Sequence, residues 1–320
     1  AALSVRLALV LFKYFPYGGL QRDCLRLMQA LEQRGHDMRV YCLSWQGEHP
    51  QGVDLRVMAV RALSNHRRYR RFHARVFEDL AREPVDGVIG FNKMPGLDIY
   101  FSGDPCFLEK ANRERGPLYR LGARYRHFSA WERAVFAPDS GVEVLLLAEQ
   151  QAEPFRHYYG TPGSRLHVLP PGLAPDRRAA EDATGRRQDK RASLALEEGE
   201  LVLLFVGSGF VTKGLDRAIT ALARMLEEQP SVVARLLVVG QDKTRRFRRL
   251  AKKLGVADKV EFLGGRDDVP ELMLAADLLL HPARAEAAGV VLLEAIAAGL
   301  PSVVTPECGY SPHVSAARAG

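Results

Sequence analysis

The chain has 320 residues, of which 47% are apolar, and carries a formal net charge of +7. This length exceeds what one small core needs and predicts two domains, while the apolar content excludes a long disordered chain. No run reaches the roughly 18 apolar residues that cross a bilayer, and the apolar run 5–12 is too short for a secretory signal. The four cysteines are scattered without a C-x-x-C pair, which fits the reducing cytoplasm.

The first half of the chain alternates short apolar runs with amphipathic stretches. We expect strands at 5–11, 38–43, 55–60, 87–91 and 142–147, and helices at 20–34 and 67–81. Strands that alternate with helices predict a parallel, doubly wound sheet.

A linker is expected where Pro170-Pro171-Gly172 opens a polar stretch that runs to residue 191. The alternation then resumes, with strands at 201–206, 236–239, 260–263 and 278–281 and helices at 215–227, 244–254, 268–275 and 290–298. We therefore expect two Rossmann-like α/β domains, 1–172 and 173–320, facing each other across a cleft. A strand at 302–305 is followed by no complete helix in 309–320, so the C-terminal domain is expected to be truncated.

The segment 284–294 places Glu286 and Glu294 around the start of a helix at Val290. A helix N-terminus has unpaired N–H groups and a partial positive charge, so it favours phosphate. Glu294 falls one turn into the helix, where it can accept two neighbouring hydroxyls. The layout suits a ligand with a diphosphate and sugar rings, although two solvated glutamates would have the same spacing.

Two glycine-containing turns follow strands. Gly18-Gly19 lets a ligand approach the backbone, or forms an ordinary tight turn. Gly207 and Gly209 give only part of a dinucleotide fingerprint, and no Walker A loop is present. What remains is Lys213, which either neutralises a diphosphate or is solvated.

Aspartates follow the fourth strand of the first half, where loops are expected to face the cleft. Asp98 and Asp104 are candidate site carboxylates or turn residues. Asp23 is expected in the first turn of its helix, where it complements the helix dipole. No H-E-x-x-H or G-x-S-x-G pattern occurs, which counts against a metalloenzyme or a triad hydrolase.

The positive net charge indicates an anionic partner. One segment of the chain accounts best for this charge. Residues 107–136 contain seven Lys/Arg against three glutamates, with Tyr119, Tyr125, Phe128 and Trp131 interleaved. This mixture suits the headgroup layer of an anionic membrane. RNA binding and a solvated helix remain open on composition.

Together these residues resemble the retaining glycosyltransferases of family 4, which have the two-Rossmann GT-B fold. The Glu286…Glu294 spacing matches that family's E-x7-E motif, and Gly18-Gly19 and Lys213-Gly214 match its donor-binding elements. The strings KYFPYGGLQRD, GFNKMPGLD and EAAGVVLLEAI are similar to the members that build the lipopolysaccharide core of Gram-negative bacteria. The resemblance covers nearly the whole chain.

The resemblance implies hexose transfer from a UDP-sugar to a heptose of the lipopolysaccharide inner core. UDP-glucose is the default donor, with UDP-galactose and UDP-GalNAc as alternatives, and no metal or other cofactor is expected. The partners would be the lipid A–core acceptor and the anionic inner face of the cytoplasmic membrane, not nucleic acid. Two other functions stay open: a UDP-sugar epimerase of the same fold, and a basic RNA- or membrane-binding module with an inactive nucleotide site.

The resemblance also assigns roles to residues. Asp104, Glu286 and Lys213 would be catalytic, and Asp23 and Asp98 would lie on the acceptor side. Donor contacts would come from Gly18, Gly19, Arg177, Lys213, Glu286, Ala287, Ala288, Gly289, Val290, Val291 and Glu294. The membrane-facing residues would be Lys110, Arg113, Arg115, Arg120, Arg124, Arg126 and Trp131. This sequence departs from the family at Ser208 and Thr212, where basic residues are usual.

Overall fold

The computed structural model describes residues 4–16, 18–173 and 182–320. The chain divides into two compact units, Ala1–Pro170 and Pro171–Gly320. The division falls within the Pro170-Pro171-Gly172 segment. Arg177 lies outside the described residues.

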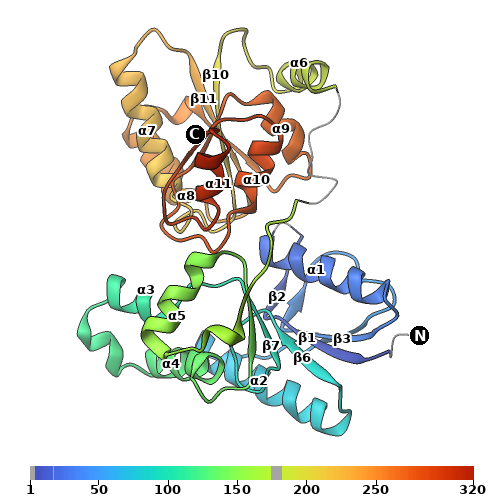
Figure 1. Ribbon diagram of the computed structural model, residues 1–320. Coiled ribbons are helices and arrows are strands. Elements are labelled where there is room, and N and C mark those ends of the chain that lie inside the picture. The colour runs from blue at the N-terminus through green and yellow to red at the C-terminus, as the bar shows by residue number, and fades with distance from the viewer. Residues whose placement is uncertain (1–3, 17, 174–181) are drawn as a thin grey trace. The chain divides into compact units, whose positions relative to one another are not determined.

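The described part of the N-terminal unit contains a seven-stranded parallel sheet in the order β5-β3-β1-β6-β7-β8-β9 (Figure 1). Its strands are β1 (Arg6–Val10), β3 (Asp37–Cys42), β5 (Asp54–Val57), β6 (Gly87–Gly90), β7 (Ile99–Ser102), β8 (Glu143–Leu146) and β9 (Leu166–Val168). A separate parallel pair joins β2 (Lys13–Tyr14) to β4 (Ser44–Trp45). The five strands expected from the sequence are confirmed. Strand β7 was missed, because its four residues lie in a stretch assigned to loops.

Helices cover both faces of this sheet. They are α1 (Gly19–Glu32), α2 (Asn65–Arg82), α3 (Phe107–Glu114), α4 (Ala123–Phe136) and α5 (Ala152–Tyr159). On one face, α1 buries Cys24 and Met28 among the strands. On the other, Phe72 of α2, Val135 of α4 and Phe155 of α5 share one core. Apolar residues at helical spacing thus decide which side of each helix meets the sheet.

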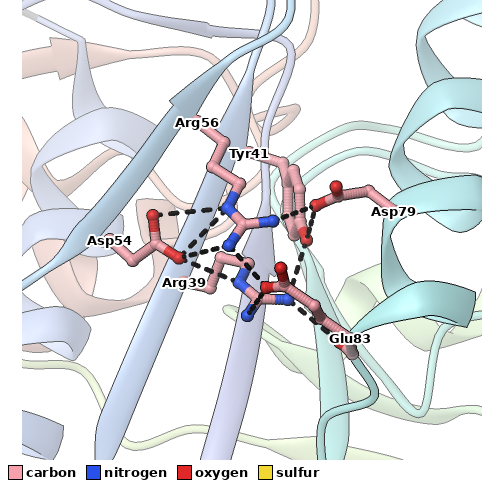
Figure 2. A network of polar contacts seen from close by, with 6 residues as sticks. All are labelled: Arg39, Tyr41, Asp54, Arg56, Asp79 and Glu83. Atoms are coloured by element: carbon pink, nitrogen blue, oxygen red, sulfur yellow. Dashed lines mark hydrogen bonds and ion pairs between the residues drawn. The ribbon is translucent and has the colours of Figure 1, made fainter.

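A polar network joins α2 to β3 and β5 (Figure 2). Arg39, which is only 6% exposed, places its Nη2 atom 2.7 Å from Glu83 Oε2 and its Nε atom 3.0 Å from Asp54 Oδ2. Beside it, Arg56 Nη1 lies 2.5 Å from Asp79 Oδ2. The Tyr41 hydroxyl also donates to Asp79, and these six residues fix the end of α2 at the sheet edge. The Tyr41 hydroxyl and then Arg56 lower the pKa of Asp79. Burial raises the pKa of Asp54, but its hydrogen bonds from Arg56 and Arg39 outweigh this effect and lower it.

The C-terminal unit has a five-stranded parallel sheet in the order β12-β11-β10-β13-β14. Its strands are β10 (Leu201–Val206), β11 (Ala234–Val239), β12 (Val260–Gly264), β13 (Leu278–His281) and β14 (Ser302–Val304), and its helices are α6 (Ala183–Ser193), α7 (Leu215–Glu228), α8 (Arg245–Lys253), α9 (Val269–Ala275), α10 (Val290–Ala297) and α11 (Ser311–Ala316). Helices α7 and α8 pack on one core, through residues such as Ile219 and Phe247. Helix α11 corrects the expectation that 309–320 contains no complete helix.

The strand orders confirm a doubly wound fold and locate its switch points. In the C-terminal unit the chain runs from β10 outward to β12, then crosses to β13 on the other side of β10. In the N-terminal unit the same reversal falls between β1 and β6. Ligands of such sheets bind beyond the carboxyl ends of the strands at these points.

Candidate active site

Lys213 and Glu286 meet at the switch point of the C-terminal unit. Lys213 lies in the turn after β10, and Glu286 follows the neighbouring parallel strand β13. Gly214, with φ of 76°, closes the first turn, and a Cβ atom there would lie 2.0 Å from the carbonyl oxygen of Pro282. Only a glycine allows this backbone contact between the two loops.

The ammonium group of Lys213 forms an ion pair with Glu286 Oε2. His281, at the end of β13, is 1% exposed, and its Nε2 atom lies 3.3 Å from the same oxygen. Burial by itself would raise the pKa of Glu286, but the charge of Lys213 and the His281 hydrogen bond outweigh it and lower that pKa to about 2. The Glu286 carboxylate is therefore ionised near neutral pH and accepts hydrogen bonds.

Arg284 holds the two loops together. Its guanidinium donates to both carboxylate oxygens of Asp216, at 2.8 and 2.6 Å, and to the Val211 carbonyl at 2.8 Å. Its backbone N–H donates to the Thr212 carbonyl at 2.7 Å. This bidentate pair lowers the pKa of Asp216. Sequence reasoning gave Arg284 no role, because its partners lie about 70 residues away in the chain.

Helix α10 begins beside Glu286. Its N-cap, Gly289, has a left-handed φ of 87°, and no side chain caps the helix. The uncapped N–H groups at this end are a ready site for an anion. Glu294 is the fifth residue of α10 and is 3% exposed. The predicted helix start at Val290 is confirmed, and the alternative of two solvated glutamates is wrong, because the Glu286 side chain is 15% exposed.

A second segment supports the backbone of 286–288. The N–H of Gly309 donates to the Glu286 carbonyl at 3.2 Å, and the N–H of Tyr310 donates to the Ala288 carbonyl at 2.7 Å. The segment that includes α11 therefore positions the loop that carries Glu286. Sequence reasoning missed this contribution, since it assigned no structure to 309–320.

The glycine turn of the N-terminal unit lies at that unit's own switch point. Gly18 is the N-cap of α1, which has no side-chain cap, and a Cβ atom at Gly19 would meet nothing within 4 Å. Asn92, after β6, accepts the Phe12 N–H at 2.8 Å and so ties the loops after β1 and β6. The turn is open beside Gly19, which is exposed, whereas Gly18 is buried against the side chains of Gln21 and Phe15. An anion at the start of α1 would therefore approach from the Gly19 side.

The three candidate aspartates occupy different places. Asp104 is half-buried beyond the carboxyl end of β7. Asp98 precedes β7, and its carboxylate accepts the Val88 N–H at 2.7 Å, so the expectation that both aspartates lie on one edge is wrong. Asp23 is the fifth residue of α1, not in its first turn, and lies 3.6 Å from Arg26. Burial raises the pKa of Asp23 against the lowering effect of nearby arginines.

A buried carboxylate anchors the loop that carries Asp104. Glu132 of α4 is fully buried and accepts the N–H groups of Phe107 and Leu108, at 2.7 and 3.1 Å, where α3 begins. It also pairs with Lys93, whose ammonium donates to the Pro105 carbonyl at 2.6 Å. In the sequence, Glu132 is distinguished only as one of the three glutamates of the basic segment.

The basic segment forms α3, a 3-10 helix (Pro117–Leu121) and α4. Arg113, Arg115, Arg120, Arg124 and Arg126 are exposed, and Lys110 is half-buried. Trp131 is 8% exposed and packs in the core, so its membrane-facing assignment is wrong.

Two leucines of this segment were missed. Leu118 is 80% and Leu121 74% exposed, next to the arginines. No helix in the described part of the chain is long and apolar enough to cross a membrane.

The two doubly wound units, with the charged pair at a switch point, define a glycosyltransferase of the GT-B class. The family Glycosyltransferase Family 4 matches residues 17–177, and Glycosyl transferases group 1 matches residues 186–320. The chain belongs to the family-4 glycosyltransferases, in the group of WaaG. It is 48% identical over 313 residues to the lipopolysaccharide glucosyltransferase WaaG of Escherichia coli (strain K12), covering 98% of this chain and 83% of that protein.

Comparison with solved structures supports the same family and fold. A crystal structure of WaaG, described as a glycosyltransferase involved in lipopolysaccharide biosynthesis, has a TM-score of 0.92 and 47% identity, over 98% of this chain and 84% of that one. Anabaena HepE in complex with UDP-glucose has a TM-score of 0.72 at 17% identity, over 96% of this chain and 82% of that one. The second likeness is one of fold alone.

Proposed function

We propose that this enzyme transfers a hexose from a UDP-sugar, UDP-glucose by default, to a heptose of the lipopolysaccharide inner core, with retention at the anomeric carbon. The observation that carries the proposal is the Lys213–Glu286 pair beside the uncapped start of α10. The name of the 48% identical relative supports a lipopolysaccharide acceptor and glucose as the hexose. The complex of HepE supports UDP-glucose as a ligand of this fold.

The chemistry assigns a task to each group. Breaking the anomeric C–O bond builds negative charge on the diphosphate, which preorganised cations and N–H groups stabilise. Lys213 and the N–H groups at the start of α10 supply this charge. Gly18 and Gly19 are assigned to the diphosphate by family resemblance. Arg177 is assigned to the phosphates by family resemblance.

The two glutamates bind hydroxyls. Glu286, which is ionised and held by Lys213 and His281, accepts hydrogen bonds from hydroxyls of the hexose. Glu294 accepts hydrogen bonds from the ribose hydroxyls. In the chain without donor, Lys213 and Glu286 compensate each other's charge. The incoming diphosphate competes for Lys213 while the sugar hydroxyls donate hydrogen bonds to Glu286, so neither charged group is left without a partner during binding.

Transfer is proposed to need no metal ion, because lysine and helix ends can neutralise the leaving diphosphate. UDP release should then be unchanged by excess EDTA and should not rise with added Mg²⁺ or Mn²⁺. A loss that added metal restores would overturn this part of the proposal.

The acceptor side is proposed to involve Asp104 and a membrane surface. The exposed arginines and the exposed leucines Leu118 and Leu121 combine positive charge with apolar side chains that can enter the lipid headgroup layer. Segments that bind at the membrane–water interface have the same combination. We propose that they hold the enzyme on the anionic inner face of the cytoplasmic membrane, where the lipid-anchored acceptor lies.

The decisive experiment measures UDP release from UDP-glucose, UDP-galactose, UDP-GalNAc and UDP-GlcNAc with deep-core lipopolysaccharide as acceptor. One donor should turn over only with acceptor present, and the product should keep the α-anomeric configuration of the donor. Interconversion of donors without acceptor would identify an epimerase instead. Absence of UDP binding in calorimetry, with liposome or RNA binding retained, would favour a non-catalytic module.

A further inference from the structure

Helix α8 carries a dense positive charge that the site does not use. Five of its nine residues form what we call the α8 face: Arg245, Arg248, Arg249, Lys252 and Lys253. All five are exposed, and Lys243 just before the helix is exposed as well.

The packing of α8 points this face away from the core. Phe247 and Ala251 are each 1% exposed and pack against α7 and the sheet. At about 100° per residue, the five cations fall within an arc of about 140°, opposite these two residues. Arg246 lies at the border of the arc, and its charge helps to lower the pKa of Asp216 in α7. The face is therefore one-sided and about 14 Å long.

The fold leaves this charge uncompensated. Among residues 4–16, 18–173 and 182–320, no ion pair joins the α8 face to a carboxylate; Arg248 instead stacks on the Phe262 ring at 4.4 Å. Like charges three and four residues apart repel one another on a helix, as Arg245 does Arg249 and Arg249 does Lys253. A polyanionic partner would relieve this repulsion.

We propose that the α8 face is an electrostatic docking surface for an anionic lipid bilayer, separate from the basic segment of the N-terminal unit. A cluster of this size on an amphipathic helix is typical of binding to anionic headgroups. Nucleic acid fits less well, since stacking of unpaired bases needs exposed aromatic rings and the one aromatic residue of α8, Phe247, is buried. The proposal does not depend on the proposed function, because it involves neither donor nor acceptor.

The test compares two variants of the full chain, each with four substitutions. In the first, Arg245→Gln, Arg249→Gln, Lys252→Gln and Lys253→Gln remove most of the α8 face while keeping the Arg248–Phe262 contact. In the matched control, Arg67→Gln, Arg70→Gln, Arg71→Gln and Arg75→Gln remove four exposed charges of α2. Binding is measured by vesicle sedimentation with phosphatidylcholine alone and with added phosphatidylglycerol, at low and high salt.

The α8 variant should bind anionic vesicles roughly tenfold or more weakly at low salt, given about 1 kcal/mol per basic residue near such a surface. The control should change less than threefold, and high salt should abolish the difference. An equal loss of vesicle binding in both variants would mean that net charge alone drives binding. Unchanged vesicle binding by the α8 variant would mean that the α8 face does not contact the bilayer. Either result overturns the proposal.

Two further measurements test nucleic acid and free phosphate as ligands of the α8 face. Tighter binding to single-stranded RNA than to anionic vesicles at equal phosphate concentration, lost in the α8 variant, would replace the bilayer by nucleic acid. Inorganic phosphate at the same concentration should not displace the protein from vesicles; displacement would mean a site for free phosphate. If the α8 variant unfolds, the pair Lys252→Glu and Lys253→Glu provides the same comparison, and unchanged binding would equally overturn the proposal.

Discussion

At the residue scale, the site depends on one carboxylate shared by a half-buried lysine and a buried histidine. Glu286 lies between Lys213 from the turn after β10 and His281 at the end of β13. The two partners keep it ionised although it is largely buried. We expect different consequences from removing the two partners, since Lys213 is proposed to face the leaving group as well, whereas His281 only orients the carboxylate.

Replacing Lys213 by methionine should lower kcat by about a hundredfold or more, the usual cost of losing one charge-stabilising donor. Steady-state UDP release with the native acceptor measures this effect. Arg224→Met, which removes an exposed cation of α7, is the control and should leave kcat within twofold. A Lys213→Met enzyme with full activity would remove the diphosphate role from this residue.

Replacing His281 by leucine should raise the pKa of Glu286, because the histidine hydrogen bond contributes to its low value. An activity that needs the ionised carboxylate is lost as pH falls through that pKa, so the acid limb of kcat/KM should move to higher pH. His281→Gln, which retains a donor, should move it less. The pH profile is the measurement, and identical profiles for the leucine variant and the parent would contradict a positioning role.

At the element scale, the N-terminal unit fixes its helices by buried polar contacts as well as by apolar faces. The six-residue network of Figure 2 joins the end of α2 to two strands, and Glu132 joins α4 to the start of α3. Such contacts decide where a helix ends against a sheet, while apolar spacing decides only which side is buried.

Replacing Arg39 by methionine should destabilise the chain by about 2 kcal/mol, because it removes the charge-assisted hydrogen bonds of a buried cation to Asp54 and Glu83. The two carboxylates keep their ion pairs with Arg56, which limits the loss. The control is Arg82→Met, since Arg82 pairs with Glu78 on the surface of the same helix, with 72% of its side chain exposed. That change should cost less than about 1 kcal/mol. Urea denaturation of both variants gives the comparison, and equal losses would show that the network adds nothing beyond surface pairing.

At the scale of the whole molecule, we assign two of the basic surfaces formed by the described residues to a membrane, the α3–α4 segment and the α8 face. They differ in character, because the first also exposes Leu118 and Leu121 and the second exposes only charge. The first should therefore bind through apolar burial and electrostatics together, and the second through electrostatics alone.

Replacing Leu118 and Leu121 by serine should weaken binding to anionic vesicles by roughly tenfold or more, since burial of a leucine contributes about 1.5–3 kcal/mol. The loss should persist at high salt, unlike that of the α8 variant. Leu63→Ser, at another position that is 98% exposed, is the control. Thermal unfolding should be unchanged in both variants. Unchanged vesicle binding by the double variant, or an equal loss in Leu63→Ser, would contradict the assignment.

The sequence by itself determined the periodic features of this protein. Alternating apolar runs predicted the doubly wound sheets, and the spacing of Glu286 and Glu294 around a glycine predicted a helix start at Val290, because these signals are local in the chain. Tertiary structure alone decided the rest. It buried Trp131 in the core, moved Asp98 to the far end of β7, and joined His281, Arg284 and Lys213 around Glu286. Those outcomes depend on which strands become neighbours, and contacts between residues about 70 positions apart leave no periodic trace in the chain.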